Sequence, residues 1–256
     1  MKEKMMKAKH FVPSSYLLFF WIVFLVSFYL TFPDESIRQR IMSEIEARTN
    51  LRADIKKVSL SPIFSLKIYD MKVYKADEQL LNIDELKIRP SLFSLFSDSM
   101  TLPFKARALG GETNGTLIYS KQSRHIENAE VNMSAILVEN IIPFIPVALG
   151  NKMLSMQGFL GGNFSLALNP EPRGEFTFDI SKLGIKNLRV RGFVFPEFIN
   201  MESSLRGKIE RDLTKIESLK LEGDGVDLTL AGTMPLVWKL KKGGVIDLGL
   251  KLQLTG

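Results

Sequence analysis

A run of alternating residues from 154 to 168 constrains the fold more than any other feature of the chain. Its polar positions include Ser155, Gln157, Asn163 and Ser165. Every second position is small or apolar: Leu154, Met156, Gly158, Leu160, Gly162, Phe164, Leu166 and Leu168. Successive side chains of a β-strand point to opposite faces, so a period of two places these residues on one face. The run predicts a long strand with one buried face.

The rest of the distal half follows the same pattern. A turn is predicted over residues 169–174, which contain two prolines and a glycine, and the alternation resumes with Phe176, Phe178 and Ile180. These two strands are expected to form an antiparallel hairpin. Further alternating runs predict more strands of the same kind at residues 188–194, 199–209, 226–234 and 246–254.

The proximal half is less regular but also favours strands. Candidate strands lie at residues 55–60, 66–74, 83–89, 104–109, 116–119 and 129–133. Two short helical interruptions are expected, one after Pro90 and one over residues 139–149, where Pro143 and Pro146 prevent a long regular helix.

A sheet that is apolar along one face must hide that face, in a closed core or in a groove that holds a lipid or a partner. Alternation predicts the face but does not distinguish these cases, and a closed protein core is the expectation that the pattern favours. The residues that mark the face as possible core or groove are Leu154, Met156, Leu160, Phe164, Phe176, Phe178, Leu228, Leu230, Leu248 and Leu250.

An uncharged segment from Phe11 to Phe32 predicts a membrane anchor. At about 1.5 Å per helical residue its length matches the hydrocarbon core of a bilayer. Four lysines precede it and Asp34 and Glu35 follow it, and basic flanks stay in the cytoplasm. The chain beyond the anchor is therefore expected outside the cytoplasm, with the N-terminus in the cytoplasm.

Two alternatives to the anchor are weaker. A secretory signal peptide ends at small residues suited to a peptidase, whereas this segment ends with bulky residues and Pro33. A buried core helix is disfavoured by the length of the segment and by aromatic residues on every face.

A short helix is expected next, over residues 33–50. Asp34 is suited to its start, Ile37, Ile41 and Ile45 form one apolar stripe, and Glu44 can pair with Arg48. We expect a spacer packed on the following sheet; a partner-binding helix near the membrane is the alternative.

Composition excludes several classes of function. The chain carries a net charge of +6, but 30 basic and 27 acidic residues remain once the lysine-rich stub is set aside, so no nucleic-acid partner is expected. The absence of cysteine excludes disulfides, a thioether lipid anchor and thiol chemistry. Of the two histidines, neither His10 nor His125 has local metal-ligand spacing, and no nucleotide-binding or nucleophile motif occurs, so we expect no cofactor, no metal and no catalysis.

Several blocks of the chain resemble a known family. These are TFP at 31–33, IRPSLFSL at 88–95, and the glycine-punctuated stretches GFLGGNFSLALNPEPRGEFTFDI and LKLEGDGVDLTLAGTMPL. In this order, behind an anchor, they resemble the type II secretion system protein N (GspN) family, within the wider AsmA-like group of elongated β proteins. The resemblance implies a bitopic inner-membrane subunit that contacts other secretion-system subunits through a periplasmic β domain. Likeness to the AsmA-like group implies the alternative, an envelope-assembly or lipid-binding protein that contacts phospholipid.

Together these observations predict a mainly β fold with a defined order of parts. We expect a cytoplasmic stub over 1–10, a transmembrane helix over 11–32, a juxtamembrane helix over 33–50, and an elongated, curled antiparallel sheet over 51–256. Three functions are distinguished: a secretion-assembly subunit, a lipid-binding groove protein, and a hydrolase, for which no concave cluster of polar residues is evident.

Overall fold

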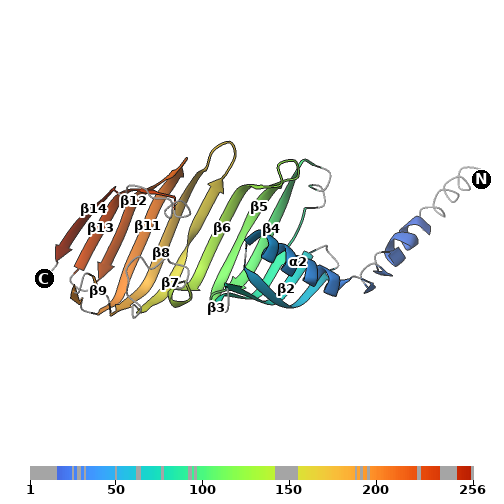
Figure 1. Cartoon of the computed structure of the whole chain (residues 1–256), viewed down its shortest axis with the longest axis horizontal. Helices are drawn as coiled ribbons and strands as arrows, with labels where there is room; N and C mark the ends of the chain where they lie inside the picture. Colours follow the sequence, from blue (N-terminus) through green and yellow to red (C-terminus); the bar gives the residue numbers. More distant parts are fainter. Residues whose placement is uncertain are drawn as a thin grey trace, which may run out of the picture.

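One long antiparallel sheet dominates the protein (Figure 1). The computed structural model describes residues 16–24, 26–27, 30–31, 33–49, 51–61, 65–75, 78–91, 94, 97–141, 155–187, 189–190, 193–194, 197–223, 226–236 and 247–254. The fold is mainly β, as the alternation predicts.

Twelve strands form the sheet, and their order in space is their order in the chain. Every neighbouring pair is antiparallel. The strands are β1 (Arg52–Ser61), β2 (Ser65–Lys75), β3 (Glu78–Ile88), β4 (Ser99–Ala108), β5 (Gly111–Ser120), β6 (Ile126–Leu137), β7 (Ser155–Ala167), β8 (Arg173–Lys186), β11 (Phe198–Glu210), β12 (Leu213–Gly223), β13 (Val226–Pro235) and β14 (Asp247–Leu254). The alternating run and its turn therefore form the predicted hairpin, β7 and β8.

Two predicted elements differ from the structure. The strand expected at 188–194 does not join the long sheet, because β9 (Arg189–Val190) and β10 (Phe193–Val194) pair only with each other. Of the two helical interruptions, the described residues contain Ser94, in 3-10 conformation, and the 3-10 helix η2 (Val138–Asn140); residues 92, 93, 95, 96 and 142–149 lie outside the described part.

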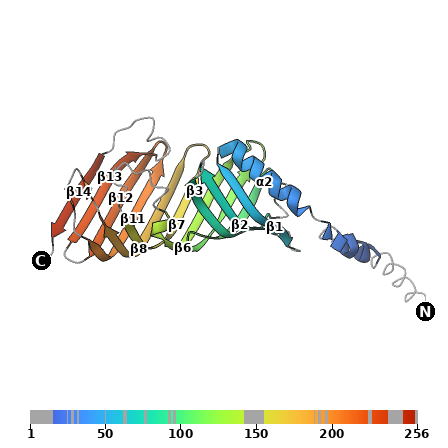
Figure 2. The same ribbon diagram turned by 60° about the horizontal axis from the view of Figure 1, so that its bottom comes forward.

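The predicted short helix is α2 (Asp34–Thr49), which lies against β1 (Figure 2). Its stripe of Ile37, Ile41 and Ile45 packs against a buried cluster in the first two strands. That cluster consists of Ala53, Ile55, Val58, Ile68, Met71 and Val73. On the outer side of the helix, Arg48 Nε lies 2.5 Å from Glu44 Oε1, as the spacing of the two residues predicts.

The described residues before α2 are mainly helical, and they extend away from the sheet (Figures 1 and 2). Their apolar side chains are exposed, from Val23 at 48% to Leu30 at 76%. No helix within the described ranges is both long and apolar enough to cross a membrane. Residues 11–15, 25, 28, 29 and 32 of the predicted anchor lie outside those ranges, and the anchor stays a prediction.

A line of irregularities crosses one end of the central strands. Register shifts occur near Ala135 in β6, Gly158 in β7 and Asn200 in β11, and each of these residues has a positive φ. Lys182 in β8 has the same conformation. Bulges of this kind bend a strand and increase its twist. Next to these irregularities lie side chains that are almost completely buried: Ile136, Leu183 and Met201. The ends of the central strands at this side of the sheet are therefore bent and closely packed.

Candidate functional site: an apolar trough along the sheet

Residues that face one another across adjacent strands point to the same side of a sheet, so the register defines its two faces. One cross-strand row, here the first row, runs from β2 to β14: Leu66, Ile88, Phe104, Gly115, Val131, Phe164, Phe176, Gly207, Ile216, Gly232 and Leu248. The second row runs from β1 to β14: Val58, Ile68, Leu86, Ala106, Thr113, Met133, Gly162, Phe178, Leu205, Leu219, Leu230 and Leu250. We call the surface formed by these two rows the trough.

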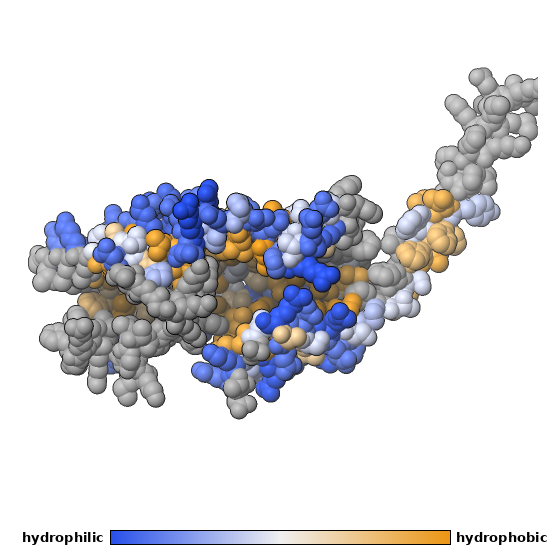
Figure 3. All heavy atoms as spheres, turned by 45° about the horizontal axis from the view of Figure 1, so that its top comes forward, coloured by the Kyte–Doolittle hydropathy of each residue, from blue (hydrophilic) through white to orange (hydrophobic). Residues whose placement is uncertain are grey.

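Apolar side chains gather along a hollow in the molecule, between hydrophilic outer surfaces (Figure 3). The residues that alternate with the trough point to the opposite face and are polar. They form a row of their own across ten strands: Ser59, Lys67, Lys87, Lys105, Asn114, Asn132, Asn163, Thr177, Arg206 and Ser218. The sheet therefore has one apolar and one polar face over almost its whole length.

Phenylalanine rings and glycines alternate in the floor of the trough. A Cβ on Gly115 would lie 2.9 Å from Phe104, one on Gly207 would lie 2.5 Å from Phe176, and one on Gly162 would lie 2.7 Å from Phe178. Each ring therefore lies across the glycine of the neighbouring strand, a packing known to support glycines in sheets. The rings of Phe176 and Phe178 stack on each other, with centroids 5.8 Å apart.

Cover over the trough differs between its two ends. In the second row, Val58 and Ile68 are 1% and 3% exposed beneath α2. Further along the same row, Phe178 and Leu230 are only half-buried, and in the first row Leu248 is 38% exposed. The proximal end is a closed core, whereas the distal side chains keep part of their surface accessible.

The residues predicted from sequence fall on this face with two qualifications. Met156, Leu160, Phe164, Phe176, Phe178, Leu228 and Leu230 are half-buried and Leu248 is exposed, while Leu154 and the side chain of Leu250 lie outside the described part. Leu228 pairs with Leu221 and Leu252, parallel to the two rows. Leu168, expected to continue the buried face, follows the end of β7 and is 38% exposed.

Strand β12 and the rows that it contributes were not predicted. Its apolar residues Ile216, Leu219 and Leu221 are spaced by three and then by two, because a register shift lies between Ile216 and Leu219. The shift hides the period of two, and only pairing with β11 and β13 makes the strand recognisable.

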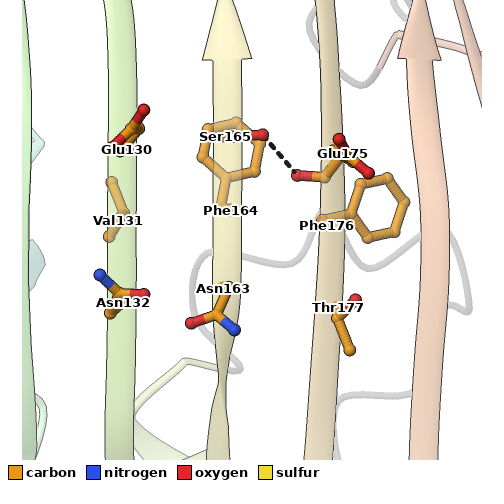
Figure 4. A pocket seen from close by; sticks show the side chains of 9 residues that line it. All are labelled: Glu130, Val131, Asn132, Asn163, Phe164, Ser165, Glu175, Phe176 and Thr177. Carbon is orange, nitrogen blue, oxygen red and sulfur yellow. Dashed lines mark hydrogen bonds between the residues drawn. The ribbon is translucent and has the colours of Figure 1, made fainter.

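A shallow cavity of about 320 Å³ lies over β6, β7 and β8, and residues of both faces line it, among them Phe164 and Asn163 (Figure 4). Its side chains include Glu130, Asn163, Ser165 and Glu175. Ser165 Oγ donates to the main-chain oxygen of Glu175 at 3.5 Å, so the hydroxyl is not paired with a carboxylate that would activate it. Across the described ranges, no group of three or more histidine or acidic residues has an arrangement suited to a metal ion.

On the polar face, ion pairs between neighbouring strands shift the pKa values of two carboxyl groups and one lysine. A hydrogen bond from Lys105 lowers the pKa of Glu112, with Nζ and Oε2 2.8 Å apart. The pair of Lys208 and Glu217, 2.9 Å apart, raises the pKa of the lysine and lowers that of the carboxyl group. These are exposed cross-strand pairs, which stabilise a sheet modestly.

Comparisons of the chain with family models, with curated proteins and with solved structures find no match.

Proposed function

We propose that this protein is a non-catalytic component of the bacterial envelope that binds lipid acyl chains along the distal part of the trough. The observation that carries the proposal is the continuity of the second row, which is closed by α2 at Val58 and Ile68 and only half-buried at Phe178 and Leu230. An acyl chain is a linear apolar ligand, and it matches a linear apolar surface that crosses many strands.

The energetics favour an apolar occupant of this surface. Burial of apolar area contributes roughly 25 cal/mol per Å², and complete burial of a leucine or phenylalanine side chain contributes about 1.5–3 kcal/mol. Phe164, Phe176, Phe178 and Leu230 are each buried only in part by the protein itself. An occupant that covers the remaining area of several such residues gains a few kcal/mol, whereas the polar face offers no comparable gain.

In-cell photo-cross-linking tests this proposal directly. Phe178, in the trough, and its neighbour Thr177, on the opposite face, are each replaced in the full chain by the photoreactive residue p-benzoylphenylalanine. After irradiation of cells labelled with radioactive phosphate, we expect labelled phospholipid on the chain with the probe at 178 and not at 177. Absence of lipid from both positions contradicts the proposal.

A second candidate is a subunit of the type II secretion assembly, and the sequence blocks at 31–33 and 88–95 support it through their resemblance to the protein N family. In that case the trough receives an apolar surface of another subunit. The same experiment separates the two functions, because the probe at 178 then yields a heavier protein adduct that contains no lipid phosphate.

Both candidates place the protein at the inner membrane, anchored through Phe11 to Phe32. The exposed apolar side chains of the helical segment, such as Phe19 at 66% and Phe20 at 65%, support this placement. A reporter enzyme that works only in the periplasm, fused after Gly256, is expected to be active. An inactive fusion, together with an active cytoplasmic reporter at the same position, contradicts the orientation.

A further inference from the structure

The polar face of the proximal strands carries a row of lysines. Lys67, Lys87 and Lys105 are separated by 20 and 18 positions in the chain, but strand pairing places them directly opposite one another across β2, β3 and β4. We call these three residues the lysine row. Like charges in facing positions repel each other and destabilise a sheet. Because the arrangement costs stability, it indicates a partner of opposite charge on this face.

Acidic residues of the protein compensate the lysine row only in part. Lys105 Nζ lies 2.8 Å from Glu112 Oε2, whereas Lys67 and Lys87 form no ion pair with any described residue. The neighbouring row on the same face consists of Lys57, Tyr69, Glu85, Arg107 and Glu112. Over β1 to β5 the two rows together therefore carry five cations and two carboxylates.

A distal pair of facing lysines is compensated within the protein. Lys208 and Lys215 lie opposite each other in β11 and β12, but Lys208 Nζ is 2.9 Å from Glu217 Oε1. The hydrogen bond to Glu217 raises the pKa of Lys208, and the charges of Glu175 and Glu210 add to the increase. Beyond Lys105, the positions that continue the lysine row are uncharged: Asn114, Asn132, Asn163 and Thr177. The uncompensated positive charge therefore lies at the proximal end of the sheet.

We propose that the proximal polar face lies on the anionic surface of the membrane, with the lysine row against phospholipid phosphates. The proposal rests on the membrane placement given under the proposed function. Helix α2 connects the segment from Phe11 to Phe32 with β1, so the strands that carry the lysine row are the nearest to that segment in the chain. The same helix packs on the apolar face of these strands, which leaves their polar face to an external partner.

The side chains of this face suit a layer of lipid headgroups. Tyr69 is half-buried between Lys57 and Glu85, and the guanidinium of Arg52 lies over the ring of Tyr74, 5.0 Å from its centroid. Tyrosine and lysine are typical of membrane–water interfaces, because each combines an apolar stem with a polar end. Lysine also binds phosphate as a point charge, which a fluid surface without fixed geometry can satisfy. The trough, on the opposite face, remains free for its own ligand.

Fluorescence quenching in nanodiscs tests this contact, because the chain contains no cysteine and a single introduced one can be labelled. Asn114→Cys places the fluorophore beside Lys105 on the polar face, and Ser43→Cys places it on the exposed side of α2, over the opposite face. The full chain is reconstituted in phosphatidylcholine with or without phosphatidylglycerol, and a lipid with a spin-labelled headgroup is the quencher. With phosphatidylglycerol we expect at least about twofold stronger quenching at 114 than at 43, and a smaller difference at high salt, because salt screens exposed charges.

A double variant, Lys67→Gln with Lys87→Gln, removes the two lysines that lack an ion pair and keeps the pair of Lys105 and Glu112. Each lysine near an anionic surface contributes about fivefold to binding, so the ratio of docked to undocked sheet should fall by about 25-fold. The matched control, Lys215→Gln with Lys220→Gln, removes the same charge from exposed positions of β12 and should leave the quenching unchanged. The melting temperature of the first variant should not fall, since repulsion between facing lysines is removed.

Several results would overturn the proposal. Equal quenching at 114 and 43, equal quenching without phosphatidylglycerol, or an unchanged signal in the Lys67 and Lys87 variant would each show that the face does not lie on anionic lipid. A chain that does not co-elute with nanodiscs would contradict the membrane placement as well. In cells, p-benzoylphenylalanine at position 114 that yields a protein adduct in place of labelled phospholipid would assign the face to an acidic protein.

Discussion

The proximal and distal ends of the sheet share one pattern of alternating apolar residues but differ in how completely the apolar face is buried. Val58 and Ile68 belong to the same cross-strand row as Phe178 and Leu230, yet only the first two are almost completely buried. Among the described elements, the one that distinguishes the two ends is α2, whose apolar stripe lies over the first strands. Alternation thus determines which face is apolar, and a separate element determines whether that face is closed.

Truncation of one large side chain at each end gives the largest expected contrast. Ile55 is 0% exposed beneath α2, so Ile55→Ala is expected to destabilise the full chain by about 2–5 kcal/mol. Leu230→Ala removes a half-buried side chain and is expected to cost about 1 kcal/mol. Chemical unfolding in detergent micelles, followed by circular dichroism, measures both. Equal losses would remove the distinction between a closed and an open end.

Two adjacent glycines test the packing of the distal floor. Gly162 has a φ of +149°, and a Cβ there would lie 2.1 Å from the main-chain oxygen of Thr177 and 2.7 Å from the ring of Phe178, whereas a Cβ on Gly161 would lie 3.5 Å from its nearest neighbour. Gly162→Ala is expected to cost about 1–3 kcal/mol through backbone strain and displacement of the ring. Gly161→Ala is expected to stay within about 0.5 kcal/mol of the wild type. A reversed order would show that the backbone and the ring of Phe178 do not confine Gly162 as described.

The packing of α2 on the first strands can be weakened without a substitution in the sheet. Ile41 lies in the stripe of α2, and Ile41→Ala is expected to cost about 1 kcal/mol because the side chain is half-buried. Hydrogen exchange should accelerate in β1 and β2 and remain unchanged in β12 and β13. The exposed Ser43→Ala variant is the matched control. Faster exchange throughout the sheet would mean that the two ends unfold as one unit.

The smallest expected effect comes from pH, and it should be similar at both ends. The pKa values of Glu112, in β5, and Glu217, in β12, are lowered in the folded protein by their lysine partners. Each pair therefore contributes stability that is present above the unfolded-state pKa and lost as the pH falls through the folded-state value. The double variant Glu112→Gln and Glu217→Gln should flatten this acid-side loss of melting temperature. An unchanged pH profile would show that these exposed pairs contribute nothing measurable.

Much of the sheet could be predicted because one-sided burial leaves a period of two in the sequence. Strands β7, β8, β11 and β13 follow this pattern closely, and the stripe of Ile37, Ile41 and Ile45 predicts α2 and its packing. Strand β12 was missed because its irregular pairing shifts the phase of its apolar residues. Residues 188–194 have the alternation of a strand but pair only locally, since sequence period does not specify the partner.

The sequence predicts which residues belong to the candidate site, but it does not predict whether their side chains are covered. The alternation identifies Phe176, Phe178 and Leu230 as members of one face. Whether they are covered depends on the reach of α2 and on the bend near Ala135, Gly158 and Asn200, where single residues with positive φ carry no strong sequence signal.

Because the strands follow one another in a meander, the length of the sheet is set by the number of its hairpins. Each strand pairs with strands that are close in sequence, so loop-closure entropy stays small and the sheet can grow by successive hairpins from the α2 end as the chain is synthesised. Because neighbouring strands are about 4.8 Å apart, removal or duplication of one hairpin changes the span by about 10 Å without altering the pairing elsewhere. The length of the sheet can thus change by the insertion or deletion of two strands at a time, while the closed core beneath α2 stays the same.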